Sequence, residues 1–253
     1  MADYVSRQSK KIAIFYSQKS SYSESLTGEF LKILSAKQQV KTLPPNNLTA
    51  WTENSSSFNP NNLVAISLVG EGADAAFFAP RIKDIETVID IIKAQEKLYN
   101  LKRLKEKSQL FGGDSLYGET TLKNGQSAIE GLTLAIPYFV NPLDSNIAKI
   151  ACIEGQNRVN WRTAAAYDAT RAFLKAISIS NPAKLTRQEI LKNLSTVQLG
   201  ANETFSGKPL RFLAGESYEG SILKQPVLVK VVKGENKSCD GYDKNGLHFQ
   251  KVD

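Results

Sequence analysis

The amino-acid sequence predicts an α/β protein organised on a doubly wound, mainly parallel sheet. Apolar stretches typical of buried strands, such as KIAIFY at residues 11–16, alternate with stretches of helical spacing up to about residue 140. The chain has 253 residues, 42% of them hydrophobic and 23% charged, which is ordinary for globular domains. This length is sufficient for one large domain or two smaller ones.

The first part of the chain supplies most of the expected strands. Residues 82–94 fit an amphipathic helix, with isoleucines at 82, 85, 89 and 92 on one side. The run at residues 63–69 suits a strand by composition and a helix by spacing, so both alternatives stay open. The other expected elements are, in order, a poorly ordered polar leader (1–10), strand 11–16, helix 25–34, strand 39–43, a loop (46–62) with a helical turn (48–51), strand 74–78, strand 109–111, a loop and short helix (121–130) and strand 131–139.

The last part of the chain changes character. Helices are expected at 146–154 and 161–177, and a capping box, TRQE at 186–189, opens a third that ends near residue 194. Strands are expected at 210–213 and 226–233 within a turn-rich tail.

Several function classes lack their usual residues. The two cysteines, Cys152 and Cys239, show no CxxC spacing; a disulfide between them is open but not deducible. His248 is the single histidine, and there is no nucleophile elbow or P-loop, so we expect neither an enzyme nor a metal or cofactor site. The net charge is +7, but the basic run KRLKEK at 102–107 has no interleaved aromatic residues. It indicates a solvated helix face, with no nucleic-acid partner.

Two further patterns concern targeting and nucleotides. The apolar runs are shorter than the roughly 18 residues of a membrane span, and residues 1–11 lack a signal-peptide core. The segment GEGADA, with Gly70, Gly72 and Ala75, resembles a dinucleotide fingerprint. That fingerprint needs a helix directly after it, whereas residues 74–78 favour a strand. A nucleotide-dependent enzyme is therefore only an alternative interpretation.

The stretch LFGGDSLYG at residues 110–118 is the strongest candidate for a site. It is read as a strand that ends in Gly112 and Gly113, which let backbone approach closely, followed by Asp114. Loops after the C-terminal ends of parallel strands line the ligand crevice of open α/β sheets. Tyr22 also lies in a loop after a strand. The alternative is an ordinary turn in which Asp114 caps a helix.

Several stretches together resemble the type I periplasmic solute-binding proteins, more narrowly the branched-chain amino-acid receptors of ABC transporters. Each is weak alone, and their order makes the resemblance more specific. They are KKIAIFYSQKSSYSESLTGEF, DAAFFAPRIKDI, LFGGDSLYG, EGLTLAIPYF, WRTAAAYDATRAFLKAI and the tail FSGKPLRFLAGE with PVLVKVVKG.

The resemblance implies two α/β lobes joined by crossing strands, with ligand bound between them. Residues 8–155 would be the complete second lobe and residues 156–225 the returning part of an incomplete first lobe. Residues 226–253 would be the last crossing strand and tail. About 120 residues of the first lobe would be absent, a length that fits ordinary domain sizes. The helix at 161–177 would then lack the sheet it normally covers, which implies a homodimer or a partner that supplies the missing lobe.

The resemblance also implies residue roles. Asp114 would hold the α-ammonium of an amino acid, and Tyr22 would close over the ligand. Ser115 and Tyr117 would add hydrogen bonds. Arg81 stands where the family has an aromatic residue, so it would meet a second acidic group of the ligand or lie on the surface.

The implied function is binding of a small molecule, an amino acid or similar, in the periplasm or another extracytoplasmic compartment. The partner would be an ABC transporter permease. A sensor domain with a signalling partner and no transport role is the alternative.

Overall fold

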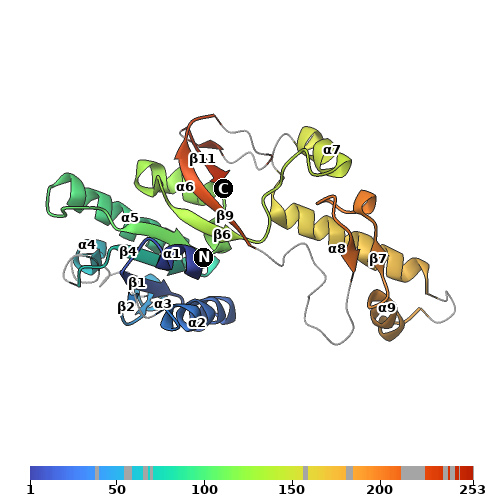
Figure 1. The fold of residues 1–253 in the computed structure, drawn as a ribbon, viewed down its shortest axis with the longest axis horizontal. Helices are drawn as coiled ribbons and strands as arrows, with labels where there is room; N and C mark the ends of the chain where they lie inside the picture. The colour runs from blue at the N-terminus through green and yellow to red at the C-terminus, as the bar shows by residue number, and fades with distance from the viewer. Residues whose placement is uncertain are drawn as a thin grey trace. The chain divides into compact units, whose positions relative to one another are not determined.

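The computed structural model describes residues 1–37, 40–53, 59–64, 68, 71–155, 159–180, 185–211, 226–235, 239, 243–244 and 246–252. These residues form two compact units (Figure 1). Unit 1 comprises residues 1–136, 228–236 and 242–253, and unit 2 comprises residues 137–227 and 237–241. The expected lobes had their boundary near residue 155, whereas the first part of unit 1 ends at Ile136 and three strands of the C-terminal tail join its sheet.

Unit 1 is built on one sheet, in the order β10-β11-β9-β6-β5-β4-β1-β2, with β3 also paired to β1. Strands β1, β2, β3, β4, β5 and β6 pair in parallel, while β9, β11 and β10 pair antiparallel. The strands are β1 (Lys11–Tyr16), β2 (Lys41–Thr42), β3 (Asn46–Asn47), β4 (Ala75–Ala79), β5 (Gln109–Gly112), β6 (Thr133–Ile136), β9 (Val227–Lys233), β10 (Asp243–Lys244) and β11 (Leu247–Lys251). The predicted doubly wound, mainly parallel α/β fold is confirmed.

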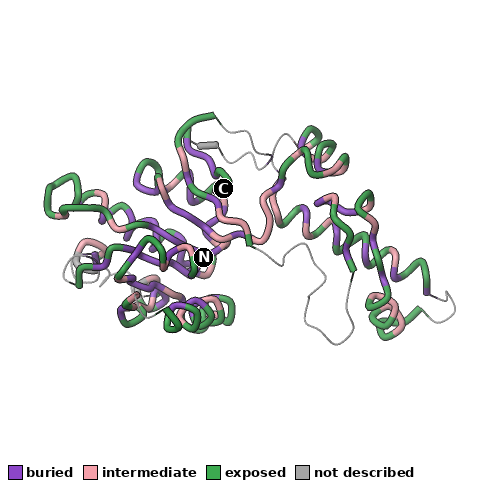
Figure 2. Tube along the Cα trace, viewed as in Figure 1, coloured by how far each residue is buried: buried purple, intermediate pink, exposed green. Residues whose placement is uncertain are grey.

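Alternation along the strands builds the core of unit 1. All five residues of β4 are buried, and Phe77 stacks on Phe30 at 3.8 Å between ring centroids. The other face carries Phe15 and Phe78, whose rings stack at 5.0 Å. Buried strands appear as continuous purple in Figure 2. The helices of unit 1 are α1 (Ala2–Ser6), α2 (Ser21–Ser35), α3 (Leu48–Glu53), α4 (Pro60–Leu63), α5 (Ile85–Asn100) and α6 (Glu119–Gly125).

The expectation of a poorly ordered leader at residues 1–10 is wrong. Residues 2–6 form α1, and Ala2 and Val5 are buried in the same core cluster as Phe30 and Phe77. Two small apolar residues among polar ones gave too weak a periodic signal for so short a helix.

Other differences are local. Helix α2 begins at Ser21, because the Ser20 side chain accepts a hydrogen bond from the Ser23 N–H, so Tyr22 is helical rather than in a loop. Ile82 opens a 3-10 turn (Ile82–Asp84) and is 80% exposed, whereas it was expected on the buried side of a helix. The expected loop at 46–62 contains β3, α3 and the start of α4. Most of the run at 63–69 lies outside the described residues.

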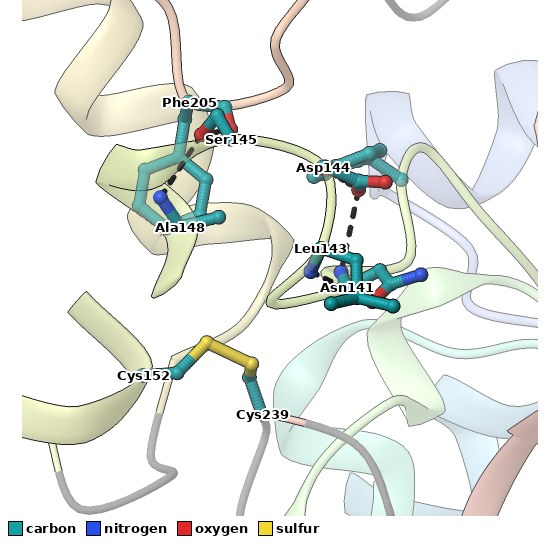
Figure 3. The surroundings of a disulfide bond; sticks show 9 residues. Asn141, Leu143, Asp144, Ser145, Ala148, Cys152, Phe205 and Cys239 are labelled. Atoms are coloured by element: carbon teal, nitrogen blue, oxygen red, sulfur yellow. Dashed lines mark hydrogen bonds between the residues drawn. A yellow bond between two sulfur atoms is a disulfide. The ribbon is translucent and has the colours of Figure 1, made fainter. Parts of the chain in front are cut away.

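Unit 2 is assembled from helices α7 (Asn146–Glu154), α8 (Trp161–Ser178) and α9 (Arg187–Leu194) and a small antiparallel pair, β7 (Gln198–Leu199) with β8 (Leu210–Arg211). All three helices agree closely with the predicted ranges. A disulfide joins Cys152 on α7 to Cys239 (Figure 3), which settles the pairing that the sequence left open. Nearby, the Ser145 hydroxyl donates to the Phe205 carbonyl at 2.6 Å and accepts from the Ala148 N–H.

Candidate functional site

The candidate site lies at the edge of the unit 1 sheet where β1, β4 and β5 end. These strands are parallel and in register, so the residues that follow them emerge at one edge. The chain order also reverses here, because β1 has β2 on one side and β4 on the other. In open α/β sheets this switch point is where ligands bind.

Tyr22 and Asp114 meet at this edge. The Tyr22 hydroxyl, from the first turn of α2, donates to Asp114 Oδ1 at 2.6 Å. Burial of the hydroxyl and then its bond to the Asp114 carboxylate raise the pKa of Tyr22, and hydrogen-bonding groups of Ser115 partly offset this rise. Tyr22 is 38% exposed and Asp114 is half-buried. The structure thus brings together three of the five predicted residues, with a carboxylate at their centre.

Gly113 has no side chain, which leaves room for the Tyr22 hydroxyl beside Asp114. A Cβ at that position would lie 2.7 Å from the Tyr22 hydroxyl oxygen and 2.6 Å from Leu26 Cδ2. The neighbouring Gly112 is equally close-packed, since its Cβ would lie 2.7 Å from Leu116 Cδ1. The two glycines therefore serve close packing, as the sequence suggested.

The interpretation of Asp114 as a helix cap is wrong. Asp114 begins a 3-10 turn (Asp114–Leu116) whose N-cap is Gly113, and α6 starts later, after Gly118. The carboxylate is thereby turned toward Tyr22 instead of a helix end.

Arg81 follows β4 and is held by two acidic residues. Its Nε donates to Asp84 Oδ2 at 2.9 Å, and its Nη2 lies 3.3 Å from Glu53 Oε1. The bond to Asp84 is the main cause of a raised pKa for Arg81. Two carboxylates therefore already balance the guanidinium charge. We expected Arg81 either to meet a second acidic group of the ligand or to lie on the surface. Its pairing with Asp84 and Glu53 fits neither expectation.

A buried polar network at the same edge was missed by sequence reasoning. Asp84 is fully buried, and its Oδ2 accepts from the Ser17 hydroxyl at 2.5 Å as well as from Arg81. The Ser17 N–H donates to the Ser23 hydroxyl at 2.7 Å, and Ser23 in turn donates to the Ala79 carbonyl. These bonds tie the ends of β1 and β4 to the helix that carries Tyr22. Serines directly after an apolar strand were the only available signal.

Tyr117 does not share this edge environment. It is 3% exposed, and its ring packs on Phe249 of β11 at 4.5 Å between centroids. The Tyr117 ring therefore contributes to the core of unit 1.

Known proteins resemble this chain in structure. No protein-family model and no curated protein sequence matches it. A leucine binding protein from Thermotoga maritima superposes with a TM-score of 0.67 at 17% identity, over 99% of this chain and 63% of its own. A type 1 periplasmic binding protein from Bordetella pertussis gives 0.67 at 12% identity, over 100% and 64%. The chain has the type I periplasmic-binding-protein fold. It spans less than two thirds of the length of these proteins.

Other structures with the type I periplasmic-binding-protein fold differ in what they bind. A solute-binding protein from R. palustris in complex with 4-hydroxybenzoate matches at a TM-score of 0.68 and 16% identity, over 99% of this chain and 62% of its own. Solute binding is thus common to these neighbours, while the fold alone does not specify the ligand.

The described part of the chain has neither a cluster of metal ligands nor a helix that could span a membrane. No three His, Cys, Asp or Glu side chains there are grouped to hold a metal ion. Within the same residues, no helix is both long and apolar enough to cross a bilayer.

Proposed function

We propose that unit 1 provides half of the ligand site of a solute-binding protein, and that the ligand is a small polar molecule with an ammonium group, such as an amino acid. The observation that carries this proposal is the Tyr22–Asp114 pair at the strand tips. The ligands of structural neighbours, which include leucine, agree with this class but do not select it.

Charge and geometry support an ammonium ligand. The ionised Asp114 carboxylate, to which Tyr22 donates, carries only acceptors and suits a ligand group rich in donors. An ammonium group has three donors, and its charge-assisted bonds to a half-buried carboxylate are strong and directional. Arg81 is already paired with Asp84 and Glu53, so a second acidic group on the ligand is not required.

The environment and partners belong to the same proposal. The Cys152–Cys239 disulfide is of a kind that persists in oxidising compartments, which supports an extracytoplasmic location. Delivery to an ABC transporter permease is the proposed role, since several neighbours are named as ABC transporter proteins. A sensor domain would use the same site with a signalling partner.

An apolar surface on unit 2 supports a covering partner. On α8 and α9, Phe173, Leu174 and Leu191 are 49%, 55% and 66% exposed within this chain. Exposed apolar groups of this kind mark interaction surfaces when they gather. We therefore propose that a second copy or further elements of the first lobe cover this face. Light scattering tests the second copy: a dimer that Leu174→Glu converts to monomer is expected, and a wild-type monomer at high concentration contradicts self-association.

The ligand proposal is tested by calorimetry of the full chain with each of the twenty amino acids. Asp114→Asn is expected to weaken binding about tenfold or more, because a charge-assisted hydrogen bond contributes roughly 1.5–3 kcal/mol. The matched control is Asp90→Asn, on the exposed side of α5, which should leave affinity unchanged. Unchanged affinity in Asp114→Asn would contradict the assignment.

A further inference from the structure

A cavity lies at the opposite edge of the unit 1 sheet from the Tyr22–Asp114 pair. It has a volume of about 350 Å³ and is bordered by the start of β5 at Gln109, the start of β6 at Thr133, and Lys230 of β9. This volume lies within the usual range of small-molecule sites. Gln109 begins β5, whereas Asp114 follows the opposite end of that strand, which is Gly112. The cavity is therefore separate from the Tyr22–Asp114 site.

The inner wall of this cavity is apolar. Ile92 of α5 and Phe111 of β5 line it and are each 2% exposed, and the edge of the Tyr4 ring packs on Phe111 at 6.2 Å between centroids. Leu110 and Ala128 extend the same wall. Such a wall suits an apolar group of a ligand and offers it no charge.

A buried amide adds a polar requirement. Gln95 lines the cavity and is 3% exposed, and its Nε2 donates to the Ser108 carbonyl at 2.9 Å. Its Oε1 is buried and receives no hydrogen bond from any residue that the structure describes. Buried acceptors are normally satisfied, so this oxygen favours a ligand group that donates.

The charges at the rim are unevenly paired. Lys107 lies 3.4 Å from Glu96 and over the Tyr99 ring, so both partners of that ion pair are accounted for. Lys230 and Glu130, by contrast, are exposed and form no ion pair within the described residues. One cation and one anion remain beside an apolar wall.

We propose that this cavity is a second binding site, for a small zwitterion with an apolar body. The ligand carboxylate would meet Lys230, its ammonium would meet Glu130 and the Gln95 amide oxygen, and its apolar part would lie on Ile92 and Phe111. An amino acid with a branched or aromatic side chain has this combination of groups. The site does not depend on the Tyr22–Asp114 pair.

The test is an NMR titration of the full isotope-labelled chain with L-leucine and L-phenylalanine. The amide signals of Gly131 and Lys230 are expected to shift in the wild type and equally in Asp114→Asn. Lys230→Ala and Glu130→Gln should each weaken this event about tenfold, because each removes one charge-assisted contact. N-acetyl-leucine and leucinamide, which lack one ligand charge each, should be weakened to the same degree.

Lys251→Ala is the matched control, because Lys251 is an exposed lysine of the neighbouring strand β11 and does not line the cavity. It should leave binding unchanged. The proposal is overturned if neither amino acid shifts these signals, if Lys230→Ala binds as well as the wild type, or if Lys251→Ala weakens binding as much as Lys230→Ala does. Shifts that vanish in Asp114→Asn would also overturn it, while leaving the ammonium site at the other edge intact.

Discussion

Units 1 and 2 bury their side chains in different ways. Of the largest fully buried side chains among the described residues, all but Phe205 belong to unit 1. They include Phe15, Phe77 and Phe78 on neighbouring strands. In unit 2, the long helix α8 buries only alanines and Asp168, and α9 buries no residue. Figure 2 shows the same contrast between the purple strands of the sheet and the largely green helices α8 and α9.

This difference indicates where each unit obtains its stability. Unit 1 has a sheet with aromatic residues on both faces, so its own core holds the candidate site in place. Unit 2 has two smaller core clusters, the disulfide and local hydrogen bonds, and the larger apolar side chains Phe173, Leu174 and Leu191 of α8 and α9 are exposed. Removing a core residue should therefore damage unit 1 most, and removing a cross-link should damage unit 2 most.

The largest effect is expected from Phe77→Ala. Phe77 is 1% exposed and stacked on Phe30, so its truncation should lower the free energy of unfolding of unit 1 by about 4 kcal/mol. Urea unfolding followed by far-ultraviolet circular dichroism, which reports on the secondary structure of both units, measures this. Phe173→Ala, at a 49% exposed position on α8, is the comparison and should change stability by about 0.5 kcal/mol or less. Equal losses would contradict the contrast between the units.

The next effect is expected from opening the disulfide. Cys152 and Cys239 are 87 residues apart in sequence, so their link restricts the unfolded chain strongly. The double variant Cys152→Ser and Cys239→Ser should destabilise unit 2 by about 3 kcal/mol. Unit 1 should be affected far less. Trp161 fluorescence, in a Trp51→Phe background, reports on unit 2. Loss of the sheet of unit 1 at the same urea concentration, followed by circular dichroism, would show that the units unfold together instead.

The sequence predicted single helices and strands better than the division of the chain into units. Continuous apolar runs such as residues 11–16 and 74–78 identify buried parallel strands, and Thr186 correctly marks the start of α9 by capping it. Spacing cannot tell which sheet a strand joins, so the sheet that β9 and β11 enter could not be read from the residues themselves; only the family resemblance implied a last crossing strand at residues 226–253.

The candidate site shows the same limits. Tyr22 and Asp114 were found because both follow strands, and their direct hydrogen bond was not predicted. Asp84 was overlooked because a single acid inside an amphipathic pattern resembles a solvent-facing residue. The buried Asp84 carboxylate accepts hydrogen bonds from Ser17, which is distant in sequence, and from Arg81, which is three residues away. The pattern of apolar residues gives no sign of either bond.

A smaller effect within unit 1 is expected from Gly113→Ala. The added methyl group would lie 2.7 Å from the Tyr22 hydroxyl and 2.6 Å from Leu26, both ends of side chains that can move. We expect a loss of about 1 kcal/mol in stability, with separation of Tyr22 from Asp114. Gly118→Ala, where no atom lies within 4 Å of the added Cβ, is the control. A crystal structure of Gly113→Ala in which the Tyr22 hydroxyl still donates to Asp114 would contradict this role.

The smallest effects are expected from the pH dependence of two acidic residues of unit 2, whose pKa values are shifted in opposite directions. The Gly200 N–H, at 2.8 Å, and the Lys175 ammonium lower the pKa of Glu203. Burial raises the pKa of Asp168, and a hydrogen bond from the Phe205 N–H at 2.7 Å only partly offsets this. Glu203 therefore contributes stability above its unfolded pKa and loses it as pH falls through its folded pKa. Ionised Asp168 lowers stability above its folded pKa, and this penalty disappears as pH falls below its unfolded pKa.

The stabilities of Glu203→Gln and Asp168→Asn should therefore differ from that of the wild type near neutral pH and equal it in acid. Glu203→Gln is expected to be slightly less stable than the wild type near pH 7 and equal to it below about pH 3. Asp168→Asn keeps an oxygen that accepts from Phe205, so near pH 7 it should match or slightly exceed the wild type, with the difference again vanishing in acid. Urea unfolding followed by Trp161 fluorescence across this range measures both. A Glu203→Gln variant that stays less stable in acid would mean that Glu203 acts through packing, because its charge is absent under those conditions.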